Sequence, residues 1–152
     1  MPPIAQSHRL RSGRFSEHGR VYFVTSTVHH RLKVFEDFWL GRILVREIKQ
    51  AHDDSLVCSL AWVIMTDHFH WLFELKHGSL AGLLQRVKSR SGIAINKQRG
   101  ANGQFWQTGF HEAAVRYDED MQKLARYIVA NPLRAGLVDR VGDYPLWDAV
   151  WL

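Results

Sequence analysis

The sequence contains a single cysteine, only four prolines in 152 residues, and no long apolar run. One cysteine cannot form an internal disulfide, and Cys58 lies in an apolar segment where a small buried thiol is the usual role. No stretch reaches the roughly eighteen consecutive apolar residues of a membrane helix. The N-terminal MPPIAQSHRLRSGRF also lacks the apolar core of a signal peptide. We therefore expect a cytosolic protein with no membrane partner.

Internal repeats, low-complexity tracts and long Pro/Gly linkers are also absent. A chain of this length with 46% hydrophobic and 12% aromatic residues can form one packed core. We predict a single domain over residues 1–152, with a basic N-terminal arm (1–20) and an aromatic C-terminal tail (139–152). The tail is expected to pack on the core, because several aromatic side chains rarely stay exposed together.

Positive charge is in modest excess, with 20 Lys and Arg against 15 Asp and Glu and a formal net charge of +5. Such an excess points to nucleic acid only where the charges cluster. Two clusters exist. One is the arm, with Arg9, Arg11, Arg14 and Arg20, and the other is the stretch 86–99, with Arg86, Lys88, Arg90, Lys97 and Arg99. Judged alone, each cluster is explained as simply by an ordinary solvated surface.

Hydrophobic periodicity divides the chain into alternating strands and helices. Thr66 and Asp67 interrupt a long apolar run and predict a hairpin turn. Ser79 and Asp118 are good helix N-caps, and Pro132 disfavours helical geometry at the residue before it. The predicted elements are a strand at 21–28, a helix at 35–51, hairpin strands at 56–65 and 68–75, a helix from Ser79 toward Asn96, a strand ending at Val115, and a helix ending near Asn131.

This order of elements predicts an α+β fold, specifically a ferredoxin-like antiparallel sheet sandwiched with helices. Paired hairpin strands with helices inserted between strands are typical of that split β-α-β arrangement. On the second predicted helix, Arg86, Arg90 and Lys97 fall close to one face.

The tripeptide His68-Phe69-His70 lies inside a predicted strand. Side chains alternate faces along a strand, so the two histidines share a face while Phe69 takes the other. Their Cα atoms are about 6.6 Å apart at a rise of roughly 3.3 Å per residue, so two imidazoles can bind one cation. The simpler alternative is a pair of hydrogen-bonded or partly exposed histidines. A catalytic metal would also need a third ligand from elsewhere.

Tyr127 and Asn131 are four residues apart on the last predicted helix and would share a face. A tyrosine hydroxyl can act as a nucleophile, and an asparagine oxygen can bind a hard cation. On spacing alone, a core aromatic and a helix terminus explain the two residues more simply.

Three segments together resemble a known family: VIMTDHFHWLFEL, GQFWQTGFHEAAVR and YIVANPLRAGLV. They are similar, in this order, to the REP-associated tyrosine transposases, a branch of the single-tyrosine HUH transposases. HUH denotes two histidines that flank a bulky hydrophobic residue, here His68, Phe69 and His70. The resemblance spans about residues 20–147, and YIVANPLRAGLV is its most specific element.

The resemblance implies the HUH endonuclease and transposase fold, with a divalent metal, Mg²⁺ or Mn²⁺, as cofactor. It implies that His68, His70 and Asn131 bind this metal and that Tyr127 attacks a DNA phosphodiester, giving a 5′-phosphotyrosine intermediate. Because imidazole is softer than the oxygen ligands that Mg²⁺ prefers, Mn²⁺ is expected to work at least as well.

The implied activity is that of a single-stranded DNA endonuclease and strand transferase, a DNA transposition and recombination enzyme. The implied partner is single-stranded or hairpin DNA of the REP palindrome type, in the nucleoid. The DNA-binding candidates are Arg9, Arg11, Arg14, Arg86, Arg90 and Lys97, and the protein could act as a monomer or a homodimer.

Three alternatives remain open at this point. The enzyme could be domesticated, cutting and rejoining palindromes without moving its own gene. The chain could be a catalytically idle DNA-hairpin-binding protein on the same scaffold. A metal-dependent hydrolase of small substrates would need only His68 and His70, and it leaves Tyr127 unexplained. His111, Arg116 and Arg134 lie in the family-like segments and could serve the core, DNA binding or catalytic support.

Overall fold

The computed structural model describes residues 16–116 and 121–150, and its centre is an antiparallel sheet. The strand order is β4-β1-β3-β2-β5, with every pairing antiparallel. The strands are β1 Val21–Thr27, β2 Val57–Ile64, β3 His68–Leu75, β4 His111–Val115 and β5 Trp147–Ala149. The first four strands have the order and connections of a ferredoxin-like sheet, which confirms the predicted fold class.

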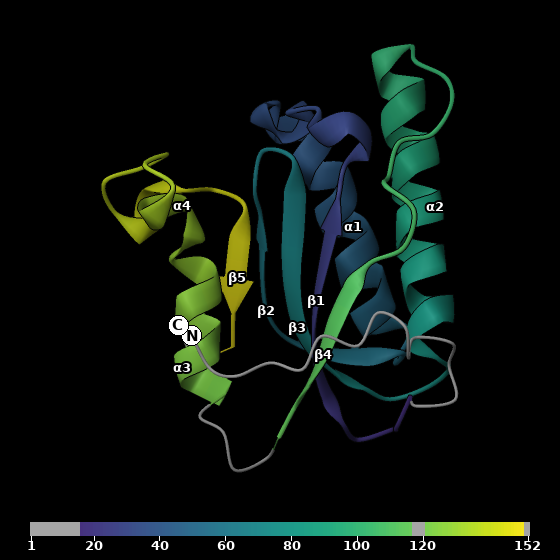
Figure 1. The fold of residues 1–152 in the computed structure, drawn as a ribbon, viewed down its shortest axis with the longest axis vertical. Helices are drawn as coiled ribbons and strands as arrows, with labels where there is room; N and C mark the ends of the chain where they lie inside the picture. Colours follow the sequence, from purple (N-terminus) through teal and green to yellow (C-terminus); the bar gives the residue numbers. More distant parts are fainter. Residues whose placement is uncertain (1–15, 117–120, 151–152) are drawn as a thin grey trace.

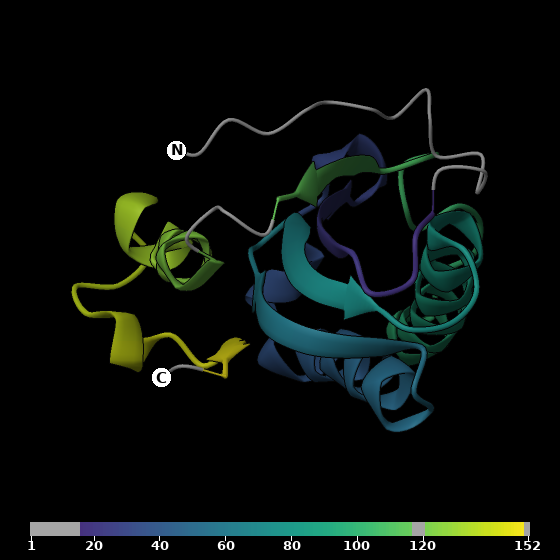
Figure 2. The same ribbon diagram turned by 90° about the horizontal axis from the view of Figure 1, so that it is seen from below.

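Helices cover both faces of the sheet. One face carries α1 (Phe38–Asp53) and α2 (Leu80–Arg99), and the other carries α3 (Met121–Val129). Figures 1 and 2 show α3 across the sheet from α1 and α2. The two faces have separate apolar cores. Side chains alternate between the faces along a strand, so the face from which a side chain projects decides which helices it contacts.

Strand β3 shows how the sequence divides its side chains between these two cores. Phe69, Trp71, Phe73 and Leu75 are fully buried toward α1 and α2. Burial of each such side chain contributes roughly 1.5–3 kcal/mol to folding, so these four hold the strand firmly in register. The intervening His68 and His70 therefore project from the α3 face, as the alternation predicts.

The helix boundaries follow their capping residues. The predicted first helix starts later than expected, at Phe38, because the side chain of Asp37 accepts a hydrogen bond from the Trp39 backbone amide. Residues Val34–Glu36 form a separate 3₁₀ turn. The predicted cap Ser79 is confirmed, since its hydroxyl accepts from the Gly82 amide.

The last predicted helix ends close to Asn131 as expected, and a separate helical turn follows it. Helix α3 ends at Val129, and α4 (Asn131–Arg134) follows as a single turn with Pro132 in its first turn. Proline is accommodated there because its missing amide hydrogen is not needed at a helix start. The predicted cap Asp118 lies outside the described residues.

The C-terminal segment adds a strand that the sequence did not predict. Strand β5 pairs with β2, with Ala61 opposite Ala149 and Val63 opposite Trp147. The segment also packs on the sheet, because Leu146 is buried and the Tyr144 hydroxyl donates to the Ile64 carbonyl. A three-residue strand with an aspartate at its centre is too short to show an alternating pattern.

Candidate active site

The two histidines lie side by side at the start of β3, on the face covered by α3. Their ring centroids are 4.9 Å apart, and the planes are steeply inclined at 77°. The Phe23 ring of β1 packs against His70 at 5.4 Å, and the His68 side chain is 21% exposed. One imidazole is thus held in the protein while the other reaches the surface.

Each imidazole is oriented through its Nδ1 atom. The Nδ1 of His70 shares a hydrogen bond of 2.8 Å with Thr25 Oγ1, directly opposite on β1. The Nδ1 of His68 donates to Asp67 Oδ1 at 2.6 Å. Metal-binding histidines commonly use one ring nitrogen for such a bond and the other for the metal. Both Nε2 atoms are therefore the candidate ligand atoms.

Asp67 also connects His68 to Arg31. Its other oxygen accepts from Arg31 Nε at 3.0 Å. Burial acts to raise the pKa of Asp67, but the hydrogen bonds from His68 and Arg31 outweigh it and hold that pKa below the usual value. The carboxylate therefore stays charged and fixes the tautomer of His68.

His70 is neutral over the physiological pH range. Burial lowers the pKa of His70 to about 3, and the nearby charges of His68 and Arg134 act in the same direction. A neutral imidazole is the form that binds a metal. The influence of Arg134 also indicates that the α4 turn lies near this pair.

Tyr127 lies on α3, half-buried against the apolar core of the same sheet face. The guanidinium of Arg134 lies over its ring, 3.8 Å from the centroid, and donates to the Tyr127 backbone carbonyl at 2.8 Å. Asn131 donates from Nδ2 to the Ile128 carbonyl at 2.8 Å. The α4 turn thus brings Arg134 and Asn131 back against the end of α3.

A small cleft adjoins the histidines. It has a volume of about 160 Å³ and is lined by Thr25, Thr27 and residues 107–111. Thr25 and Thr27 are the register partners of His70 and His68, so the cleft lies one strand away from the pair. His111 lies opposite Thr25 on β4 and is exposed.

The predicted DNA-binding residues are not gathered here. Arg86 forms an ion pair with Asp54, and Arg90 forms one with Glu47 at 3.1 Å, so both point toward α1 on the opposite side of the sheet. Lys97 is exposed near the end of α2. Arg9, Arg11 and Arg14 lie outside the described residues. DNA contact by these six residues stays a prediction.

Sequence reasoning missed the groups that orient the histidines. Thr25 is found only through the β1–β3 register, which no single sequence displays. Asp67 was interpreted as a turn residue, although its position directly before His68 was a usable signal. The importance of Arg134 follows from the α4 turn, which carries it back onto Tyr127.

Within the described residues, no group of three or more His, Cys, Asp and Glu side chains is arranged to hold a metal ion. A metal bound at His68 and His70 would therefore need other donors, such as an amide oxygen or the substrate itself.

In the part of the chain that the structure describes, no helix is long and apolar enough to cross a membrane.

Comparison with known proteins decides the family. The family described as transposase IS200 like matches residues 18–131, three quarters of the chain, including both histidines and Tyr127. The chain belongs to this family. The resemblance predicted from the sequence is thereby confirmed.

Two transposase relatives support the same assignment. The REP-associated tyrosine transposase of Escherichia coli K12 is 29% identical over 87 residues, which are 56% of this chain and 50% of that protein. A Haemophilus influenzae Rd protein, provisionally given the same name, is 27% identical over 138 residues, 84% of this chain and 78% of its own. The match to the E. coli transposase thus spans only half of that protein's length.

Solved transposase structures share the fold. A REP-associated tyrosine transposase bound to a REP hairpin superposes with a TM-score of 0.72 at 23% identity, covering 88% of this chain and 79% of that one. A Deinococcus radiodurans protein provisionally described as a transposase gives a TM-score of 0.52 at 18% identity, covering 78% of this chain and 95% of that one. At these identities the likeness concerns the fold alone.

Proposed function

We propose that this transposase is a metal-dependent single-stranded DNA endonuclease and strand transferase that acts on REP-type palindromic hairpins through Tyr127. The observation that carries the proposal is the histidine pair, whose Nδ1 atoms are both engaged while α3 packs on the same sheet face. The name of the E. coli relative and the hairpin in the solved structure support the choice of DNA.

The donor set fits a divalent metal. His68 and His70 would bind it through Nε2, and Asn131 through its amide oxygen, since its amide nitrogen donates to the Ile128 carbonyl. A bound Mg²⁺ or Mn²⁺ supplies Lewis-acid polarisation of the scissile phosphate. Two imidazoles favour Mn²⁺ over Mg²⁺, which prefers oxygen ligands.

Tyr127 supplies the nucleophile. Its Oη attacks the phosphorus and loses the phenolic proton, the P–O3′ bond breaks, and the 3′ oxygen takes up a proton and leaves as a hydroxyl. The 5′-phosphate stays joined to Oη. A free 3′-hydroxyl of another strand can then attack the same phosphorus and release Tyr127, so rejoining needs no external energy source.

The covalent intermediate gives the test of this proposal. Labelled single-stranded REP-type hairpins, incubated with the protein and Mn²⁺ or Mg²⁺, should give a protein–DNA band that survives denaturing electrophoresis. Chelation of the metal with EDTA should abolish the band. Hairpin binding without any such band, under both metals, would instead favour an idle DNA-binding protein.

Asp67→Asn tests the orientation of His68. An amide accepts more weakly than a carboxylate from His68 and Arg31, so we expect Mn²⁺ affinity to fall about 10- to 100-fold. Isothermal titration with Mn²⁺ measures the change. Asp143→Asn, at an exposed ion pair with Arg140, is the matched control and should bind Mn²⁺ normally. Equal affinities for the two variants would contradict the role given to Asp67.

Arg134 positions the nucleophile and adds positive charge where negative charge develops on Oη and the phosphate. We expect Arg134→Gln to slow adduct formation about 100-fold at saturating DNA, with Arg134→Lys partly restoring the rate. Single-turnover gels measure both. Arg126→Gln, exposed on α3, is the control. A rate unchanged in Arg134→Gln would exclude this role.

A further inference from the structure

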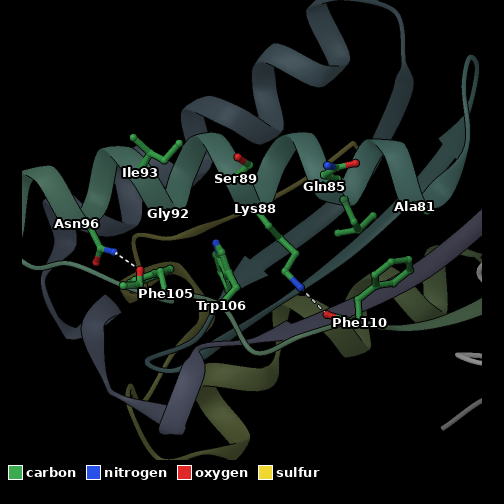
Figure 3. Close-up of a pocket in the computed structure, with 13 residues that line it drawn as sticks. Ala81, Gln85, Lys88, Ser89, Gly92, Ile93, Asn96, Phe105, Trp106 and Phe110 are labelled. Carbon is green, nitrogen blue, oxygen red and sulfur yellow. Dashed lines mark hydrogen bonds between the residues drawn. The ribbon is translucent and has the colours of Figure 1, made fainter.

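A second and larger cavity lies away from the histidines, between α2 and the segment that leads into β4. It has a volume of about 450 Å³, within the range of about 300–1,000 Å³ that is usual for small-molecule sites. Figure 3 shows Phe105 and Trp106 beneath the helix and Lys88 reaching across the cavity. Its Nζ donates to the backbone carbonyls of Gln107 and Gly109. We call this cavity the α2 groove.

The segment is fixed to the helix by polar contacts at several points. Trp106 Nε1 donates to Ser91 Oγ at 3.1 Å, and Asn96 Nδ2 donates to the Gly103 carbonyl at 2.9 Å. Gly92 faces this contact, where an added Cβ would lie 3.4 Å from Phe105 Cβ. The groove is thus preformed, because its two walls are hydrogen-bonded to each other.

The lining of the α2 groove combines aromatic rings with positive charge. Phe105, Trp106 and Phe110 all contribute to it, and the exposed Ile93 lies along it, 69% accessible. Lys88 lines it, and Arg99 lies 6.0 Å from the Phe105 ring at one end. Among the lining residues that the structure describes, none is an Asp or Glu. Flat apolar walls beside cations suit a planar ring attached to an anion.

The groove adjoins the cleft beside the histidines. Gly109 and Phe110 line both, and Thr25 and Thr27 on the far side of the cleft pair with His70 and His68. Residues 109 and 110 therefore form a wall that the two cavities share. A DNA strand that reached from the cleft to the groove would pass over this shared wall.

We propose that the α2 groove binds one unpaired nucleobase of the DNA, some nucleotides away from the scissile phosphate. This inference rests on the proposed function. A nucleobase has a planar face for the aromatic and Ile93 surface, and the adjoining phosphate matches the positive charge of Lys88 and Arg99. The base must be unpaired, because a paired base is stacked inside a duplex and cannot enter a pocket.

The test couples a change in the DNA to a change in the groove. Each unpaired nucleotide of a REP-type hairpin is replaced in turn by an abasic nucleotide, which keeps the phosphate and removes the base. Ile93→Glu puts a carboxylate in the acid-free groove at an exposed position. Gln98→Glu is the matched control, exposed on the same helix and outside the groove. Affinities are measured by fluorescence anisotropy with labelled hairpins.

We expect one abasic position to weaken binding to the wild-type protein about 10-fold, the loss typical of one stacked base. The same substitution should cause no further loss in Ile93→Glu and the full loss in Gln98→Glu, because only the first variant has already lost the contact. Equal losses in all three proteins at every position would overturn the groove proposal.

Two other outcomes distinguish a failure of the groove proposal from a failure of the proposed function. If the wild-type protein forms the covalent adduct but shows no coupling, the groove proposal fails and the proposed function stands. If the wild-type protein neither binds the hairpin nor forms an adduct, the proposed function fails. A shift in the sedimentation of DNA-free protein on Ile93→Glu, without coupling to any base, would assign the groove to a second copy of the chain and overturn its role in DNA binding.

Discussion

Tyr127→Phe is expected to reduce formation of the covalent protein–DNA adduct to background, by a factor on the order of 10³ or more. The substitution removes only Oη, the atom that we propose attacks the phosphorus. The ring keeps its packing against the sheet, and its face remains available to the Arg134 guanidinium. Hairpin affinity should therefore stay within about twofold of the wild type, which fluorescence anisotropy measures, while denaturing gels measure the adduct.

Tyr144→Phe is the matched control, since it makes the same chemical change at a structural tyrosine. The Tyr144 hydroxyl donates to the Ile64 carbonyl, and burial raises the pKa of Tyr144 to about 12. Its loss should lower the free energy of unfolding by about 1 kcal/mol and leave adduct formation intact. An adduct that persists in Tyr127→Phe would mean that another residue is the nucleophile.

His70→Ala is expected to have the second-largest effect, on both Mn²⁺ binding and adduct formation. It removes one of the two proposed metal ligands and leaves Thr25 without its hydrogen-bond partner, so under the proposal one imidazole alone would have to hold the cation. We expect no measurable Mn²⁺ binding by calorimetry and no adduct at any practicable metal concentration. Thermal unfolding followed by circular dichroism shows whether the variant is still folded.

His77→Ala provides the comparison for His70→Ala. His77 is an exposed histidine just beyond the other end of β3, so its removal changes the histidine count without touching the pair. This variant should bind Mn²⁺ and form the adduct as the wild type does. Undiminished Mn²⁺ binding by a folded His70→Ala variant would contradict the assignment of the metal site.

The fold was largely accessible from the sequence because most elements are long and strongly patterned. The alternation through β3 correctly placed His68 and His70 on one face, since four fully buried side chains fix the opposite face. The start of α1 was misplaced because a 3₁₀ turn continues the apolar pattern just before the Asp37 cap. Strand β5 was missed because its three residues are extended only through their pairing with β2, which no local sequence pattern shows.

The candidate site was only partly accessible, because its supporting contacts join distant parts of the chain. The bond between Thr25 and His70 depends on a strand register across 45 residues. The stacking of Arg134 on Tyr127 depends on the turn at Pro132, and the sequence pattern there indicates only a helix end. Likewise, the charges of Arg86 and Arg90 were visible, but not their ion pairs with α1.

The most direct test of the central claim is to identify the residue that carries the DNA. The adduct formed with a REP-type hairpin and Mn²⁺ is digested with nuclease and trypsin, and the modified peptide is sequenced by mass spectrometry. The account predicts a nucleotide joined through its 5′-phosphate to Tyr127. A nucleotide on any other residue, or one joined through its 3′-phosphate, would contradict it.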